Sequence, residues 1–198
     1  MIVGLTGGIG SGKTTVAKMF AEKENVIIYI ADLEAKKLMN SSKTIKTKLI
    51  EAFGENTYQN NQLNRQFIAN IVFNNKSKLA ILNSIVHPEV KLHFKNFVQK
   101  HQNKTYIIYE NAILFESKAD KMCDFIISVY VPLEERILRI QKRDNATKSE
   151  ILARINSQFK EEKKLLQSNY LIENILLEKN SKQVNNIHNI LTQKTTLI

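Results

Sequence analysis

The stretch IVGLTGGIGSGKTTVAKMF, residues 2–20, decides the fold of this chain. Four of the protein's six glycines fall within six positions here, between an apolar run and an amphipathic one. The spacing Gly7-x-x-x-x-Gly12-Lys13-Thr14 is the P-loop pattern. The motif stands where its mechanism requires it, after a predicted strand and at the start of a predicted helix. We therefore expect the loop to bind a nucleoside triphosphate.

The residue types of the loop explain that chemistry. Glycines let consecutive backbone N–H groups turn inward around a phosphate, because glycine accepts conformations that a Cβ atom forbids. The helix that follows adds its unpaired N–H groups and the positive end of its dipole. Lys13 is placed to reach the β- and γ-phosphates, and the Thr14 hydroxyl is placed to ligate Mg²⁺. The expected cofactor is therefore Mg²⁺, with the nucleotide as co-substrate.

Size and composition indicate one globular domain with room for a small insertion, since 198 residues include 43% apolar and 24% charged residues. The only cysteine, Cys123, excludes an intramolecular disulfide and is typical of a reducing compartment. The first residues lack the basic flank of a signal peptide, and the longest apolar runs are too short to span a bilayer. We expect a soluble, cytoplasmic protein with no membrane partner.

The net charge of +10 has two interpretations, and the sequence leaves both open. Such a charge attracts polyanions, from nucleic acid to a substrate that carries several phosphates. It is also what a solvated, lysine-rich surface gives. The lysines are spread along the chain, and no dense basic run interleaved with aromatic residues occurs, so we expect no nucleic-acid partner.

Apolar runs alternate with amphipathic segments along the whole chain. Continuous apolar runs are typical of strands in a parallel sheet that is covered on both faces. Alternating strands and helices imply an α/β protein with a parallel, doubly wound sheet and right-handed crossovers. Strands are predicted at 1–6, 25–31, the start of 105–115, 123–131 and 170–174; helices are predicted at 14–23, 33–53, within 64–102 with a break at His87-Pro88, from Pro132 in its first turn, at 149–169 and at 181–194.

The class of P-loop protein follows from the motifs that are missing. A GTPase carries a base-reading N-K-x-D motif, and the two candidates, NKSK at 75–78 and NKTY at 103–106, lack the aspartate. No D-x-x-G switch occurs either. The pattern favours an ATP-dependent kinase of small molecules, in which the protein supplies positioning, cations and a base.

Asp32 is the candidate base. It lies just beyond the carboxyl end of the second predicted strand, on the edge where doubly wound sheets bind ligands. Aspartate is also a favoured N-cap residue, so Asp32 is equally well placed to cap a helix that begins at Leu33. Position alone does not separate these two roles.

Arginines in ERILRIQKRDNATKSEILAR, residues 135–154, are the candidate cations for the γ-phosphate. Arg136, Arg139 and Arg143 share one helical face, because they are spaced i, i+3 and i+7. They fit either a charged surface helix or a lid that closes on phosphates.

Taken together, these residues resemble the dephospho-CoA kinase family, which catalyses the last step of coenzyme A synthesis. The resemblance runs nearly end to end. It is carried by GLTGGIGSGKTTVA, ADLEAKKL, AFGE, LNRQFIANIVFNN, LNSIVHPEV, AILFES, RILRIQKRDNATKSEILARINSQ and LIEN. It implies a P-loop kinase core at 1–32 and 104–198, a helical substrate domain inserted at 33–103, and a helical lid at about 136–160.

The resemblance also implies roles for individual residues. Asp32 is the expected base, with Lys13 and Arg139 as further catalytic residues. Asn64 and Arg65, together with His87 of VHPEV, belong to the domain that faces dephospho-CoA, although His87 is equally suited to a structural role at the helix break. The expected ATP-binding residues are Gly8, Gly10, Ser11, Gly12, Lys13, Thr14, Thr15, Arg139 and Arg143; Arg154 also matches a lid position.

Three positions depart from the family pattern. Ile30 replaces the first acid of Asp-x-Asp, which leaves Asp32 alone. Ala112 stands where the family commonly has proline in Pro-Leu-Leu-Phe-Glu, a segment that ends here at Glu116. Glu110 stands where the family often has aspartate, and we expect it to hold Mg²⁺ through water.

The resemblance implies transfer of a phosphoryl group from ATP to the ribose 3′-hydroxyl of dephospho-CoA, which gives CoA and ADP. Alternatives are another small-molecule or nucleoside monophosphate kinase, and a basic P-loop ATPase that acts on nucleic acid. The expected assembly is a monomer or a small homo-oligomer.

Overall fold

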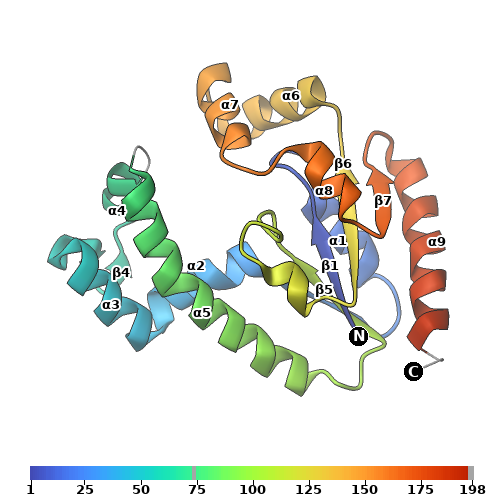
Figure 1. Ribbon diagram of the computed structural model, residues 1–198, viewed down its shortest axis with the longest axis horizontal. Coiled ribbons are helices and arrows are strands. Elements are labelled where there is room, and N and C mark those ends of the chain that lie inside the picture. Colours follow the sequence, from blue (N-terminus) through green and yellow to red (C-terminus); the bar gives the residue numbers. More distant parts are fainter. Residues whose placement is uncertain (73–74, 196–198) are drawn as a thin grey trace. The chain divides into compact units, whose positions relative to one another are not determined.

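The computed structural model describes residues 1–72 and 75–195. They form two compact units: residues 1–30 with the chain from 101 onward, and residues 31–100. The predicted boundaries of the inserted domain were 33 and 103, so the second unit begins and ends slightly earlier. Figure 1 shows a sheet flanked by helices in the first unit. The second unit is mainly helical and contains one small two-stranded hairpin.

The first unit is built on a five-stranded parallel sheet of order β2-β5-β1-β6-β7, which confirms the predicted doubly wound fold. All strands point the same way, so their carboxyl ends share one edge, as parallel sheets require. The strands are β1 (Ile2–Thr6), β2 (Val26–Ile30), β5 (Tyr106–Glu110), β6 (Phe125–Tyr130) and β7 (Tyr170–Glu173).

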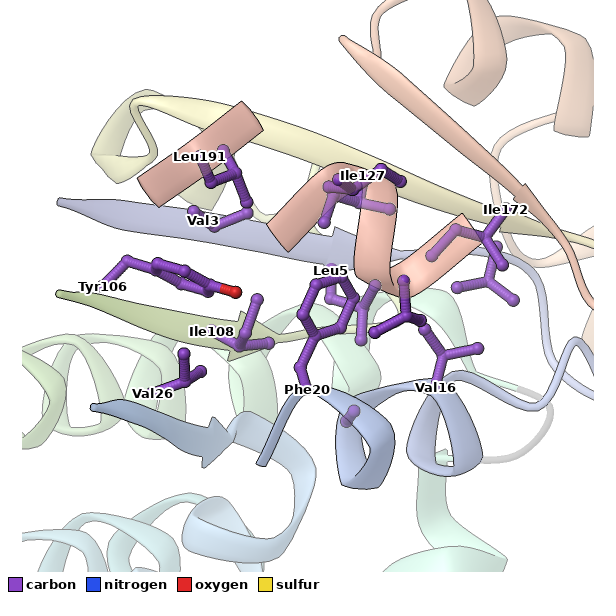
Figure 2. Close-up of a cluster of buried hydrophobic side chains, with 14 residues drawn as sticks. Val3, Leu5, Val16, Phe20, Val26, Tyr106, Ile108, Ile127, Ile172 and Leu191 are labelled. Carbon is purple, nitrogen blue, oxygen red and sulfur yellow. The ribbon is translucent and has the colours of Figure 1, made fainter. Parts of the chain in front are cut away.

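The main core lies between this sheet and the helices α1 (Lys13–Ala21) and α9 (Leu177–Thr195). Figure 2 shows apolar side chains of all five strands meeting Val16 and Phe20 of α1 and Leu191 of α9. Phe20 also meets the fully buried ring of Tyr106 edge-on, with 6.5 Å between the centroids. Burying this face fixes α1, and therefore the loop that precedes α1, against the sheet.

Three further helices follow β6: α6 (Leu133–Asp144), α7 (Lys148–Asn156) and α8 (Glu161–Leu166). Pro132 is the N-cap residue of α6 and precedes its first turn, one position earlier than predicted. The predicted single helix over 149–169 is wrong, because the chain leaves the helical path between α7 and α8. There the backbone N–H of Phe159 donates to Glu116 Oε1 at 2.8 Å, so it is lost to a continuous helix.

The second unit packs three shorter helices against one long one. Helices α2 (Ala31–Ser41) and α3 (Lys43–Phe53) replace the predicted single helix over 33–53. They divide at Ser42, whose extended backbone and side-chain bond to the Ile45 N–H make it the N-cap of α3. A short 3₁₀ turn (Glu55–Thr57) and a hairpin of β3 (Tyr58–Gln59) and β4 (Gln62–Leu63) lead to α4 (Arg65–Val72).

Helix α5 (Lys76–Lys100) runs through Pro88 without a break, so the predicted interruption at His87-Pro88 is wrong. Proline removes one helical N–H and disfavours the helical conformation of the residue before it. Packing overrides that local cost, because Val86 and Val90 on either side of Pro88 are buried and α5 contacts α2, α3 and α4. Residues 73–74, which fall within the predicted helical span 64–102, lie outside the described part.

Across residues 1–72 and 75–195, no helix combines the length and apolar character needed to cross a bilayer.

Candidate active site

The glycine loop joins β1 to α1 at the carboxyl edge of the sheet. Gly12 occupies the left-handed region (φ 78°) and is the N-cap residue of α1, with no side chain capping that helix end. The backbone N–H groups of Gly10 and Gly12 have no acceptor among the residues that the structure describes. Unpaired N–H groups at the positive end of a helix form an anion site, which is the property predicted for this loop.

Lys13 turns back over the first half of the loop. Its Nζ donates to the carbonyl oxygens of Gly7 at 3.1 Å and Gly8 at 3.3 Å, and the side chain is largely buried. The ammonium group is therefore held at the Gly7–Gly8 end of the loop. In nucleotide-binding P-loops in general, the lysine at this position binds the β- and γ-phosphates.

Thr14 and Glu110 bring two kinds of oxygen together. The Thr14 hydroxyl donates to Glu110 Oε1 at 3.1 Å, and Glu110 is buried at the end of β5. Within the described ranges 1–72 and 75–195, no group of three or more His, Cys, Asp or Glu residues is arranged so that it could hold a metal ion by itself. Mg²⁺ at a nucleotide typically takes one or two protein oxygens and completes its shell with water and phosphate. A hydroxyl and a carboxylate fit that requirement, so the residues present suit Mg²⁺.

Arg136 supports the loop from α6. It is almost fully buried, and its Nε donates to the carbonyl oxygen of Ile9 at 2.9 Å. Its Nη1 pairs with Glu161 Oε2 of α8 at 2.6 Å. The guanidinium group fills the space where a Cβ atom on Gly8 would stand. Gly8 is therefore required by this close approach, and Arg136 is a buried support of the loop.

The other arginines of the predicted lid have surroundings different from those of Arg136. Arg139 is half-buried, and it donates to Glu135 at 3.0 Å and to the carbonyl oxygen of Asn174 at 3.0 Å. Arg143 is exposed and forms a two-pronged contact with Asp144, at 2.7 and 2.9 Å. Arg154 of α7 pairs with the same carboxylate at 2.9 Å. Of these three side chains, Arg139 is the one that extends toward the glycine loop.

Asn174 is a loop contact that the sequence did not single out. It directly follows β7, and its Nδ2 donates to the carbonyl oxygen of Ser11 at 2.7 Å. The same amide stands where a Cβ atom on Gly12 would be. Its position one residue after a strand, at the sheet's carboxyl edge, was the available signal.

Gln158 is a second such contact. It lies in the connection between α7 and α8, and its Oε1 accepts the backbone N–H of Ile9 at 2.9 Å. No periodicity or spacing marks a glutamine in a connection, so only the folded chain reveals this contact.

Four predicted site residues belong to the unit of residues 31–100. Asp32 is exposed in the first turn of α2, which begins at Ala31, so the alternative in which Asp32 caps a helix that begins at Leu33 is wrong. The helix starts earlier because Ala31 directly continues β2. Asn64 precedes α4 and caps it, since its Oδ1 accepts the Phe67 N–H at 3.1 Å.

The other two have different surroundings. Arg65 is exposed, and no ion pair of it occurs among the described residues. His87 is half-buried in α5, and this burial lowers the pKa of its imidazole.

The dephospho-CoA kinase family model matches residues 1–179, which include every residue of the site described above. The chain belongs to the dephospho-CoA kinase family. Among its relatives, a dephospho-CoA kinase of Bacteroides fragilis is 37% identical over 172 residues, covering 87% of this chain and 83% of that protein. A dephospho-CoA kinase of Fusobacterium nucleatum is 39% identical over 175 residues, covering 88% of this chain and 89% of that protein.

Solved structures agree with the fold. The structure of TT1252 from Thermus thermophilus superimposes with a TM-score of 0.85 at 27% identity, covering 96% of each chain. Dephospho-CoA kinase from Campylobacter jejuni gives a TM-score of 0.72 at 24% identity, covering 98% of each chain. A shikimate kinase from Acinetobacter baumannii, at 15% identity and a TM-score of 0.57, shares the fold over 98% of this chain and 94% of its own.

Proposed function

We propose that this protein transfers the γ-phosphoryl group of ATP to the ribose 3′-hydroxyl of dephospho-CoA, giving CoA and ADP. The observation that carries the proposal is membership of the dephospho-CoA kinase family over residues 1–179. The geometry of the glycine loop independently supports the binding of ATP that the proposal requires, because an uncapped helix end, open N–H groups and a lysine ammonium meet there.

In this reaction the loop binds the triphosphate. The N–H groups around Gly10 and Gly12 and the dipole of α1 stabilise phosphate oxygens, and the Lys13 ammonium binds the β- and γ-phosphates. Thr14 and Glu110 are the residues that would hold Mg²⁺, Glu110 through water. Bound Mg²⁺ would neutralise charge on the phosphates. The remaining loop residues, Gly8, Ser11 and Thr15, shape the cradle.

Asp32 is the proposed base. The 3′-hydroxyl oxygen attacks the γ-phosphorus, the bond from that phosphorus to the β,γ-bridging oxygen breaks, and the hydroxyl proton passes to the Asp32 carboxylate. ADP leaves with the bridging oxygen. Because Ile30 replaces the first acid of the family's Asp-x-Asp pattern, Asp32 alone would accept that proton.

Acceptor recognition and charge neutralisation are assigned to two groups of residues. We propose that Asn64, Arg65 and His87 contact dephospho-CoA, with Asn64 also capping α4. Arg139 and Arg143 are proposed to contact ATP from a lid that comprises α6 and α7. Arg139 already lies beside the loop, whereas Arg143 must exchange its contact with Asp144 for phosphate.

A product assay with competing acceptors tests the function. The protein is incubated with ATP, Mg²⁺ and equal concentrations of dephospho-CoA, adenosine and AMP, and the products are separated by chromatography. We expect CoA and ADP in equal amounts. Phosphorylation of AMP or adenosine in place of dephospho-CoA would favour the nucleoside monophosphate or other small-molecule kinase. ATP hydrolysis stimulated only by DNA or RNA, with binding that weakens steeply with salt, would favour the nucleic-acid ATPase.

A further inference from the structure

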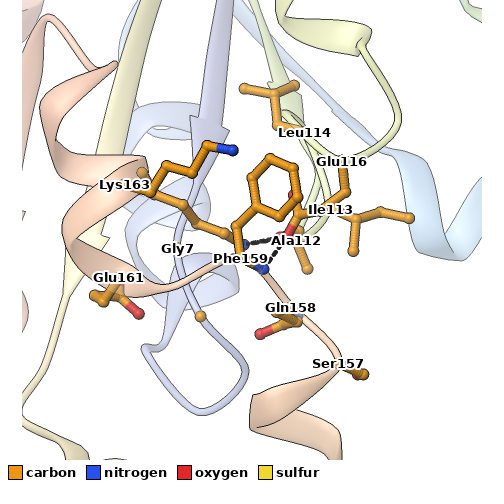
Figure 3. Close-up of polar contacts among 12 residues, drawn as sticks. Gly7, Ala112, Ile113, Leu114, Glu116, Ser157, Gln158, Phe159, Glu161 and Lys163 are labelled. Atoms are coloured by element: carbon orange, nitrogen blue, oxygen red, sulfur yellow. Dashed lines mark hydrogen bonds and ion pairs between the residues drawn. The ribbon is translucent and has the colours of Figure 1, made fainter.

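In the glycine loop, both polar backbone groups of Ile9 form hydrogen bonds to side chains that lie outside the loop. Its N–H donates to Gln158 Oε1 at 2.9 Å, and its carbonyl oxygen accepts from Arg136 Nε at 2.9 Å. Both partners lie more than 120 residues away in the sequence. Figure 3 shows the Gln158 side chain extending from the connection between α7 and α8 toward the loop that begins at Gly7.

This contact lies at the reactive end of the loop. Lys13 Nζ, which in a P-loop reaches the β- and γ-phosphates, bonds to the carbonyl oxygens of Gly7 and Gly8, the two residues directly before Ile9. The Ile9 N–H differs from those of Gly10 and Gly12, because a side chain of the protein already occupies it. Gln158 therefore lies where the transferred phosphoryl group belongs.

The position of Gln158 is fixed by its neighbours. The N–H of Phe159 donates to Glu116 Oε1 at 2.8 Å, and the same oxygen pairs with the fully buried Lys164 at 2.9 Å. Lys164 also donates to the carbonyl oxygen of Ala112 at 2.8 Å. The buried Lys164 ammonium group, which contacts both of these oxygens, therefore holds the connection against the core of the first unit. Gln158 is thus set in place before any nucleotide binds.

The chemistry of a primary amide explains what Gln158 adds. Its carbonyl oxygen is used by Ile9, and its planar NH₂ group, on the same carbon, keeps two donor hydrogens. Nε2 has no acceptor among the residues that the structure describes. A donor fixed beside an anion site is suited to a phosphate oxygen, and hydrogen bonds to a charged acceptor are the stronger kind.

We propose that Gln158 is a positioning residue for the γ-phosphoryl group: Oε1 holds the loop through Ile9, and Nε2 donates to an oxygen of that group. This inference rests on the proposed function only in taking ATP as the ligand of the loop. It requires no particular acceptor. It also assigns a role to the α7–α8 connection, whose Gln158 bonds to the loop at Ile9.

The test compares two nucleotides that differ in the γ-phosphoryl group. Dissociation constants for ADP and for a non-hydrolysable ATP analogue with a β,γ-imido link are measured by calorimetry with Mg²⁺ present. Gln158→Met keeps the side-chain volume and removes both hydrogen bonds, whereas Gln158→Glu keeps an acceptor for Ile9 and removes the donor. We expect each variant to lose at least about tenfold in affinity for the analogue relative to ADP, as loss of a charge-assisted hydrogen bond predicts.

Gln167→Met is the matched control, because Gln167 is the C-cap residue of α8 and its side-chain amide donates to the Lys163 carbonyl oxygen in that helix. Its nucleotide preference should equal that of the wild type. Equal losses for ADP and the analogue, or no loss in a variant that keeps the wild-type melting temperature, would overturn the proposal. If Gln158→Met does not fold, Gln158→Leu takes its place, because it is also uncharged and lacks both hydrogen-bonding groups, whereas the added charge of Gln158→Glu would repel the γ-phosphate by itself.

The two proposals fail separately. In one outcome, the Gln158 variants lose affinity for the ATP analogue relative to ADP, but the wild-type protein does not phosphorylate dephospho-CoA. That outcome supports this inference and contradicts the proposed acceptor. In the opposite outcome, the wild-type protein makes CoA, but the variants bind ADP and the ATP analogue with the wild-type preference. That outcome supports the proposed function and contradicts this inference.

Discussion

The Lys13 ammonium has carbonyl partners of its own, because Nζ bonds to Gly7 and Gly8 while facing the phosphate site. Lys13→Ala removes this cation from the transferring phosphoryl group. Turnover should fall by about 10²-fold or more, as for other lost charge-stabilising groups. The free energy of unfolding should fall by no more than about 3 kcal/mol, because the loss of two charge-assisted hydrogen bonds is partly offset by no longer burying the ammonium charge. Steady-state kinetics and thermal unfolding measure both effects, and near-normal turnover would contradict the loop assignment.

Asp32 gives a sharper residue-scale prediction, because its exposed place in the first turn of α2 leaves its carboxylate with no packing role. Asp32→Asn keeps the shape and removes the proton acceptor. General-base contributions are typically ~10²–10⁴-fold, so turnover should fall by about that factor. The loss of one favourable helix-dipole interaction should lower stability by less than about 1 kcal/mol. ATP binding, measured by calorimetry, should be unchanged.

Glu34 provides the control for that variant, since it lies in the same turn and pairs with Lys37 at the surface. Glu34→Gln should retain wild-type turnover. An Asp32→Asn protein that turns over at the wild-type rate would show that the base lies elsewhere.

At the scale of elements, α6 separates the two roles that the sequence left open for its arginines. Its buried face holds Arg136 against the loop, its flank directs Arg139 to Asn174, and its C-terminal end leaves Arg143 in solvent beside Asp144. The helix is therefore neither a plain surface helix nor a row of equivalent phosphate ligands. Position along the helix decides how far each side chain is from the loop.

Arg139→Ala should reduce turnover by at least about tenfold and leave the melting temperature within a few degrees, because the side chain is half-buried and faces the loop. Arg143→Ala tests whether its exchange from Asp144 to phosphate takes place. If Arg143 binds ATP during turnover, the Michaelis constant for ATP should rise several-fold. An exposed ion pair alone is worth less than about 1 kcal/mol, so its loss would hardly change stability.

Lys142→Ala is the control on the same turn of α6, since it removes one exposed positive charge without a loop contact. Kinetics of Arg143→Ala that match those of Lys142→Ala would assign Arg143 to the surface.

At the scale of the whole molecule, the last helix packs on the sheet through apolar side chains and also makes a contact with it that depends on pH. His188 Nδ1 of α9 lies 2.8 Å from the hydroxyl of the buried Tyr106 on β5. Burial, and then the positive charge of Lys23, lower the pKa of His188. Protonation also removes the Nδ1 lone pair that can accept the tyrosine hydrogen.

The sign of the pH effect follows from that lowered pKa. The unfolded chain binds a proton at His188 more readily than the folded chain, so stability rises with pH across this window. The contribution is fully present above the ordinary histidine pKa of about 6.5 and is lost as the pH falls below it. We expect the melting temperature to fall between pH 7 and pH 5.5, and to fall less in His188→Gln. An equally steep fall in the variant would assign the effect to other groups, among them His87, whose pKa burial also lowers.

The sequence by itself determined the sheet, its parallel direction and the loop that binds phosphate. These features depend on local signals, because buried strands appear as continuous apolar runs and a glycine cluster between a strand and a helix is typical of a phosphate-binding loop. It also placed Lys13, Thr14 and Glu110 at the ends of elements that share one edge of the sheet. The resemblance to dephospho-CoA kinases, which the family match confirms, came from those same motifs.

Only the tertiary structure decided where helices continue and which side chains support the loop. Helix α5 passes through Pro88 because buried neighbours outweigh a local preference, and the segment after α7 leaves the helix because Glu116 takes the Phe159 N–H. Arg136 and Gln158 reach Ile9 from more than 120 residues away. Contacts of this kind leave no period in the sequence, since each depends on where distant segments meet after the core has packed.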